Sequence, residues 1–229
     1  FRKPAANDST DTLGFLDTTW NVPWRAVRYD TISDARDGRT YRTIVVGSAR
    51  WMAENLNFRV DSSWCPASNA DSCKKYGRLY AWSAAMDTSA RFDSATLAPV
   101  AKRRGICPEG WHVPNNTEWS SLFAAASQIR PASILRAVGP VWSDSAGLDS
   151  IGMRILPAGK RIRYAQAPYA SLTERNLATQ FWSATESTLS AFKASSWRLT
   201  SAQAPTRTEY DKLEAHSVRC VSDTAVVAP

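Results

Sequence analysis

The stretch CPEGWHVPNNTEWSSLFAAA, residues 107–126, carries the strongest local signal in this 229-residue chain. Asn115 suits the N-cap of a helix, and Glu118 stands three residues later, the spacing of a capping box. Four apolar residues then stand at i, i+3, i+4 and i+7, the spacing of one helix face. They are Trp119, Leu122, Phe123 and Ala126. The stretch therefore predicts an amphipathic helix that Pro131 ends.

Working outward, the flanking segments predict shorter elements. Residues 131–138 predict a second short helix that stops at Gly139-Pro140. Upstream, residues 41–46 and 49–58 predict a hairpin around Gly47-Ser48. The segment GRLYAWSAAM (77–86) fits either a short helix or a buried strand, and a helix from Ala81 is favoured.

The second half of the chain consists of short extended segments separated by turns. These are MRILPAG (153–159), KRIRY (160–164), QFWSATE (180–186), FKASSWRLT (192–200) and HSVRCVSD (216–223). Helices in the first half and strands mostly in the second favour an α+β fold with an antiparallel sheet. We expect one domain over residues 33–223, an N-terminal arm or linker over 1–32 and a tail over 224–229.

Composition excludes several classes of protein. The net charge is +7 with a pI near 9.4, but the positive charges are scattered and accompany no nucleic-acid-binding motif. The two histidines are too few for a His-rich metal site, and no cysteine pair has zinc-knuckle spacing. No apolar run has the length of a membrane span. We therefore expect no nucleic-acid partner, no metal and no cofactor.

The four cysteines allow three disulfide pairings. The favoured one joins Cys65 to Cys73 across a short polar loop and Cys107 to Cys220 across 113 positions. The alternative is four reduced, buried thiols. Disulfides require an oxidising compartment, so the bridged alternative predicts an exported protein.

Several motifs together resemble one family. In order, they are DGRTYRTIVVGSARWMAENLNF (37–58), KKYGRLYAWSAAM (74–86), CPEGWHVPNNTEW (107–119), ILPAGKR (155–161), FWSATES (181–187) and SVRCVSD (217–223). Their order and spacing resemble the Fibrobacter succinogenes major paralogous domain. The resemblance implies a C-type-lectin-like fold, of the branch related to formylglycine-generating enzymes, in an exported bacterial surface protein, often a lipoprotein.

The resemblance also bears on function. The Glu-Pro-Asn, Gln-Pro-Asp and Trp-Asn-Asp motifs of Ca²⁺-dependent lectins are absent. Formylglycine-generating enzymes have a copper-binding cysteine pair near the C-terminal end, whereas this chain has only Cys220 in its C-terminal half. An oxidase of that kind is therefore not expected. In some lectin-fold proteins, diversity-generating retroelements rewrite the C-terminal part. Here FWSATE and SVRCV would frame such a diversified segment.

Three motif residues have a structural and a chemical interpretation, and the structural one is favoured for each. His112 is expected to bond a backbone carbonyl in a packed corner rather than to act as a base. Trp182 is expected in the core. Glu186 is expected to orient a loop through backbone N–H groups, because no partner carboxylate for acid catalysis is evident.

The segment 187–216 combines Ser, Thr and Ala with isolated large side chains, a composition typical of protein-binding loops. The candidate ligand-binding residues are Phe192, Lys193, Ser195, Trp197, Arg207 and Tyr210, extended by Tyr164 and Tyr169. Strand alternation places Phe192 and Trp197 on opposite faces unless a bulge intervenes. The alternative is a solvated sheet with no ligand.

We therefore expect a non-catalytic extracellular binding module, an adhesin or receptor with a protein or carbohydrate ligand. The alternative is a structural subunit of a surface assembly, such as a pilus tip, that engages a neighbour through residues 1–30. Of the ten tryptophans, five in the family motifs are expected to pack in the core: Trp51, Trp82, Trp111, Trp119 and Trp182. Trp20 and Trp24 are expected to fix the arm, Trp64 stands beside the short cysteine loop, and Trp142 stands in a turn-rich connection. Trp197 is the one tryptophan in the expected binding segment and is therefore the candidate anchor.

Overall fold

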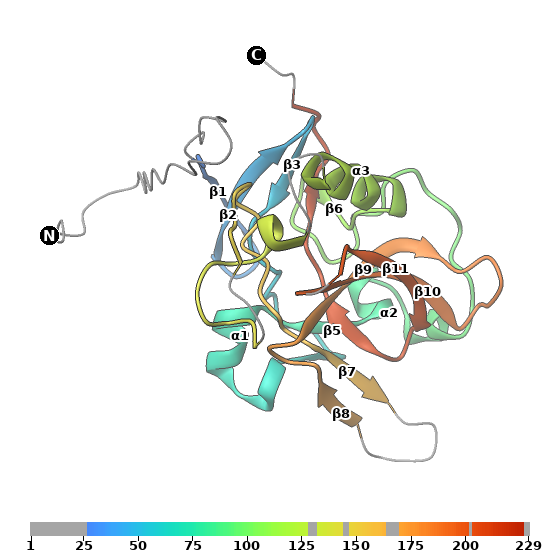
Figure 1. Ribbon diagram of the computed structural model, residues 1–229. Helices are drawn as coiled ribbons and strands as arrows, with labels where there is room; N and C mark the ends of the chain where they lie inside the picture. Colours follow the sequence, from blue (N-terminus) through green and yellow to red (C-terminus); the bar gives the residue numbers. More distant parts are fainter. Residues whose placement is uncertain (1–26, 128–131, 144–146, 164–169, 202, 227–229) are drawn as a thin grey trace, which may run out of the picture.

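A computed structural model describes residues 27–127, 132–143, 147–163, 170–201 and 203–226 (Figure 1). The fold is α+β, with mostly antiparallel strands in two sheets. The three α-helices of these residues are α1 (Ala70–Tyr76), α2 (Trp82–Ala85) and α3 (Asn116–Ser127). Three short 3₁₀ helices are η1 (Pro66–Ser68), η2 (Ala90–Asp93) and η3 (Ala132–Leu135).

The first sheet has five strands and joins both ends of the described chain. Their order is β1 (Asp30–Ser33), β2 (Thr40–Val46), β3 (Ala49–Met52), β13 (Val221–Ser222) and β6 (Trp111–His112). The expected hairpin is confirmed: β2 pairs with β3 around Gly47, whose φ of 61° suits a glycine. Because β1 pairs with β2, the sheet already includes residues 30–32 of the expected arm.

The second sheet has eight strands. Six follow in the order β11 (Thr206–Asp211), β10 (Lys193–Thr200), β9 (Ala178–Glu186), β12 (Ala215–Ser217), β5 (Leu79–Ala81) and β4 (Ser63–Trp64). Strand β7 (Lys160–Arg163) pairs with β12 and with β8 (Ala170–Thr173). The β9–β10–β11 ribbon is thus at one edge, and β4, which precedes α1, is at the other.

The predicted helix 116–127 begins as its sequence indicates. Glu118 N–H donates to Asn115 Oδ1 at 3.0 Å, and Asn115 N–H donates to Glu118 Oε2 at 2.9 Å, a reciprocal capping box. Burial acts to raise the pKa of the Glu118 carboxyl. The hydrogen bonds from His112 and from Asn115 N–H outweigh burial, so this pKa lies below its ordinary value.

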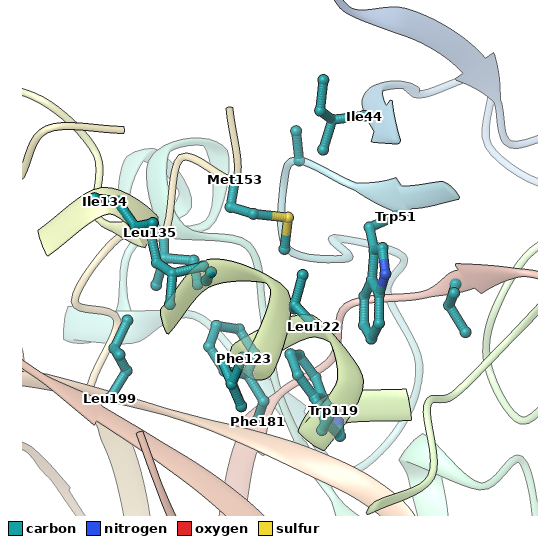
Figure 2. Packing of buried hydrophobic residues seen from close by; sticks show 14 of the residues in the cluster. Ile44, Trp51, Trp119, Leu122, Phe123, Ile134, Leu135, Met153, Phe181 and Leu199 are labelled. Atoms are coloured by element: carbon teal, nitrogen blue, oxygen red, sulfur yellow. The ribbon is translucent and has the colours of Figure 1, made fainter. Parts of the chain in front are cut away.

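The apolar stripe of α3 packs into one of the hydrophobic clusters of the core (Figure 2). The Trp119 ring lies 5.0 Å from that of Trp51 in β3 and 5.1 Å from that of Phe181 in β9. The helix therefore joins the two sheets. All five tryptophans expected in the core are buried, as is Trp142, whereas Trp20 and Trp24 lie outside the described residues.

Three element predictions are wrong in part. Residues 153–159 form isolated bridges instead of a strand, because Arg154 has a φ of 49° and Pro157 has no N–H to donate. The helix expected over 131–138 is the 3₁₀ turn η3, which ends where Ala137 N–H bonds Ile155 O. Residues 77–86 contain both predicted alternatives, β5 followed by α2.

The segment 216–223 is divided between the sheets. It supplies β12 to one sheet and β13 to the other, and Cys220 lies between them. The disulfides Cys65–Cys73 and Cys107–Cys220 confirm the favoured pairing, and no cysteine is free. Two disulfides are consistent with an oxidising compartment.

Candidate functional site

The predicted ligand-binding residues 192–210 lie on the β9–β10–β11 ribbon at one edge of the larger sheet (Figure 1). Strand β10 pairs with β11 in regular register from Lys193–Asp211 to Arg198–Thr206. Its pairing with β9 shifts register between Ala194 and Ser196, which marks a β-bulge. The expectation that Phe192 and Trp197 lie on opposite faces of the strand held only without such a bulge. Simple alternation therefore does not describe which side chains of β10 reach solvent.

Trp197 packs against α3 instead of standing free on the surface. Its ring lies 5.0 Å from the Phe123 ring, and its indole N–H donates to Asn116 Oδ1 at 3.3 Å. Trp197 is half-buried and its N–H already has a partner, so its main role is to pack the hairpin against α3. The structure thus removes the main reason for regarding Trp197 as a free ligand anchor.

Ser195 also faces the helix. It is 3% exposed, and its Oγ accepts a hydrogen bond from Asn116 Nδ2 at 3.0 Å. A ligand on the surface cannot contact a side chain at that depth without moving α3. Ser195 and Trp197 together fix the hairpin to the start of α3, and both are corrections to the predicted contact set.

Tyr210 lies on the opposite side of the hairpin from Trp197. Its ring stands edge-on to the His216 ring at 4.9 Å, and Lys160 Nζ lies 4.3 Å from its centroid. Burial raises the pKa of the Tyr210 hydroxyl. Tyr210 is half-buried and belongs to this neighbouring polar cluster, so it does not share a surface with Arg207, which pairs with Trp197 in the β-ladder.

The exposed members of the predicted set are Phe192, Lys193 and Arg207. Phe192 is 58% exposed, which is unusual for a side chain of that size. Two further exposed apolar side chains accompany it at the end of the hairpin: Leu189 at 91% and Leu213 at 36%. We call Leu189, Phe192, Lys193 and Leu213 the tip patch.

Hydrogen bonds bring the two loops of the tip patch together. Phe192 O accepts a bond from Lys212 N–H at 2.9 Å, which joins Phe192 to the residue that precedes Leu213. Ser187 Oγ accepts from the N–H groups of Leu189 and Ser190 at 3.1 Å each. The apolar side chains are therefore presented by an ordered turn.

The base of the tip patch is a buried ion pair. Lys212 Nζ, with a fully buried side chain, donates to Glu186 Oε2 at 2.6 Å and to the carbonyls of Phe92 and Ala95. Glu186 Oε1 accepts from Leu97 N–H at 2.8 Å, which confirms the expected loop-orienting role of Glu186. All three donor positions of the ammonium group are satisfied, as burial requires.

Sequence reasoning missed Leu189 and Leu213. Isolated leucines in polar loops are common, and only their exposed fractions and their proximity to Phe192 distinguish these two. Tyr164 and Tyr169, between β7 and β8, lie outside the described residues. So do residues 1–26 of the proposed contact arm, although Val27 and Tyr29 pack against the core.

Residues of the family motifs form a framework around the N-terminal end of α3. Trp182 is fully buried, as expected, and stacks on His216 at 4.1 Å. The expectation for His112 is wrong: its Nδ1 lies 2.6 Å from Asp223 Oδ1 and its Nε2 lies 2.7 Å from Glu118 Oε1. An imidazole between two carboxylates joins β13 to the start of α3.

In the part of the chain that the structure describes, no three His, Cys, Asp or Glu side chains are grouped to hold a metal ion. Within the same ranges, no helix has the length and apolar character required to cross a bilayer.

Comparison with known proteins gives one match. The model of the family described as the Fibrobacter succinogenes major domain matches residues 44–222, well over half of the chain. No curated protein and no solved structure matches the chain significantly.

Proposed function

We propose that this chain, which belongs to the Fibrobacter succinogenes major domain family, is an extracellular, non-catalytic binding module with a protein ligand. The observation that carries the proposal is the tip patch. Three large apolar side chains, Leu189, Phe192 and Leu213, are exposed on two loops that the Lys212 N–H to Phe192 O bond joins. Exposed apolar groups of this kind mark interaction sites on soluble proteins.

The surroundings of the tip patch favour a protein over a neutral sugar. Lys193, next to Phe192 in the chain, and its ladder partner Asp211 are exposed charged side chains at this end of the hairpin, which gives an apolar centre with a polar rim. Phe192 is the expected energetic centre, since large rigid side chains dominate binding when they are desolvated. A protein partner would cover both loops at once.

The finer fold assignment belongs to the same proposal. We infer a C-type-lectin-like arrangement. It is supported by the α+β architecture, by the long Cys107–Cys220 bridge, and by the first and last strands of the described chain, β1 and β13, which belong to the same sheet. The β10–β11 hairpin lies between the motifs FWSATE and SVRCV, so it is the surface that a retroelement would diversify. A reverse transcriptase gene beside a near-copy of the 3′ coding end would test that part.

The binding experiment compares a tip-patch variant with a control variant at another exposed leucine. Leu189→Ala/Phe192→Ala removes the apolar centre, and Leu177→Ala removes a leucine that is 54% exposed at the other end of β9. Each purified chain is applied to immobilised surface and matrix proteins from the source cells and to a glycan panel. Surface plasmon resonance then gives the Kd for any ligand found.

We expect a protein ligand whose affinity falls at least about ten-fold in the tip-patch variant and stays unchanged in Leu177→Ala. A ligand whose Kd ignores the tip-patch variant would place the binding site elsewhere. Binding of glycans alone would overturn the choice of a protein ligand. Equal thermal unfolding temperatures of the variants would show that the loss is not a folding defect.

A further inference from the structure

A pocket of about 390 Å³ lies between β2, the end of α1 and residues 154–156. It is remote from the tip patch, because α1 follows β4 at one edge of the larger sheet and β11 forms the other edge. Figure 1 places α1 and the β10–β11 hairpin on opposite sides of the molecule. The pocket is therefore a separate site.

The lining of this pocket is strongly cationic. Six positively charged side chains contribute to it and one carboxylate, that of Glu54. The six are Arg39, Arg42, Lys74, Lys75, Arg154 and Arg219. The pocket thus gathers positive side chains in a chain whose net charge is +7.

Half of these cations are already neutralised. Arg42 bonds Glu54 at 2.5 Å, Arg39 bonds Asp37 at 3.0 Å and Lys74 bonds Asp71 at 3.1 Å. The charged groups of the other three, Lys75, Arg154 and Arg219, form no ion pair within 4.0 Å among the described residues, although Asp149 Oδ1 accepts the backbone N–H of Arg154 at 2.6 Å. The Glu54 and Asp149 carboxylates offset part of this positive charge at longer range, and an anion in the pocket would offset the remainder.

Arg219 forms the inner wall and is held in place by neutral groups. It is 1% exposed and donates to Asn55 Oδ1, at 3.1 Å from Nε and 2.8 Å from Nη2, and to Met153 O. Burial lowers the pKa of Arg219 to about 10, so its guanidinium remains charged at neutral pH. A fixed positive charge at the base of a pocket attracts an anion without using a mobile side chain.

The pocket also presents a neutral polar group. Asn57, which is 9% exposed, contributes its side-chain amide to the lining. A primary amide donates and accepts hydrogen bonds, so it can bind a ligand hydroxyl or carbonyl. Tyr41, whose hydroxyl accepts a bond from Asn57 N–H at 3.1 Å, supplies an adjoining ring.

We propose that this pocket binds a carboxylate-bearing sugar unit of an acidic polysaccharide. Its volume lies at the lower end of the range for ligand pockets, which fits one or two sugar rings. Guanidinium and ammonium groups bind the carboxylate, and the Asn57 amide binds ring hydroxyls. The proposal does not depend on the tip patch.

The test uses isothermal titration calorimetry on the full chain with uronate oligomers of galacturonate, glucuronate and mannuronate. Each oligomer is paired with its methyl ester, which keeps the rings and removes the charge. Inorganic phosphate and a sulfated oligosaccharide are the other two probes. Lys75→Gln/Arg154→Gln removes two unpaired cations, and the exposed pair Arg91→Gln/Arg104→Gln removes the same charge elsewhere.

We expect one uronate oligomer to bind the wild type and its ester not to bind. The pocket variant is expected to lose at least about ten-fold in affinity and the control variant less than about two-fold. Equal binding of the ester, unchanged binding of the pocket variant or no binding of any uronate would overturn the proposal. Phosphate or sulfate binding as tight as the uronate would show a general anion site and overturn the assignment to a sugar acid.

This test separates the two proposals. Leu189→Ala/Phe192→Ala leaves the pocket intact, so its uronate affinity should equal that of the wild type. A loss of uronate binding in that variant would place the sugar at the tip patch instead.

Discussion

The two disulfides enclose loops of very different length, and their removal should therefore cost different amounts of stability. Cys107–Cys220 spans 113 positions, whereas Cys65–Cys73 spans 8. The perturbation is a pair of double variants, Cys107→Ala/Cys220→Ala and Cys65→Ala/Cys73→Ala. Each removes one bridge and leaves the other in place.

The expected magnitudes follow from the entropy that each bridge removes from the unfolded chain. The chain-entropy relation gives about 5 kcal/mol for the long loop and about 2.5 kcal/mol for the short one. Cys107 and Cys220 are also fully buried in a hydrophobic cluster, so truncating them leaves a cavity that adds to the loss. The long-loop variant should therefore lose at least about 2 kcal/mol more than the short-loop variant.

The assay is urea unfolding followed by tryptophan fluorescence, for which the five buried framework tryptophans are suitable reporters. The free energy of unfolding in water comes from linear extrapolation. Reduced wild-type protein keeps all four sulfurs and separates the loop entropy from the cavity. Equal losses in the two variants, or a larger loss for Cys65→Ala/Cys73→Ala, would refute the entropy argument.

Three further predictions concern stability and pH. Trp197→Ala should lower the free energy of unfolding by about 2–3 kcal/mol, because the ring packs on α3. Phe192→Ala should change it by less than about 0.5 kcal/mol. A larger loss for Phe192→Ala than for Trp197→Ala in urea titrations would contradict the packing role of Trp197. Asn115→Ala removes the acceptor for Glu118 N–H and should cost about 1 kcal/mol, and an unchanged urea midpoint would show that the cap contributes nothing. Burial raises the pKa of the Asp149 carboxyl from 3.8 to about 6. In this window the folded chain keeps a proton that the unfolded chain releases, so stability falls as pH rises through it. Asp149→Asn should make stability depend less on pH between 3.8 and 6. If the urea midpoint of the variant still fell by the wild-type amount over this range, another group would be responsible for the pH dependence.

The elements that the sequence predicted well depend on local chemistry. The helix beginning at Asn116 follows from the reciprocal bonds between Asn115 and Glu118, which neighbouring residues make without help from the rest of the fold. The hairpin around Gly47 is equally local. The disulfide pairing was favoured because one loop is short and polar, and the structure has that pairing.

The candidate site depended on contacts between distant segments, and there the sequence was a weaker guide. Its composition indicated the hairpin of residues 192–211. Only the position of Asn116, 81 residues before Trp197, shows that the indole is engaged by α3. The loop that carries Leu213 joins Phe192 through the hydrogen bond from Lys212 N–H to Phe192 O, a contact that no spacing rule predicts.

The sequence by itself determined the family, the α+β class and the main helix, because these follow from short-range patterns and from motif order, and it favoured the disulfide pairing that the structure confirms. The tertiary structure alone decided which aromatic side chains remain exposed and where the positive charge gathers. Arg39, Lys75, Arg154 and Arg219 are scattered along the chain and meet only at one pocket. Burial and charge density are properties of folded neighbours, and they arise only when the chain has brought those neighbours together.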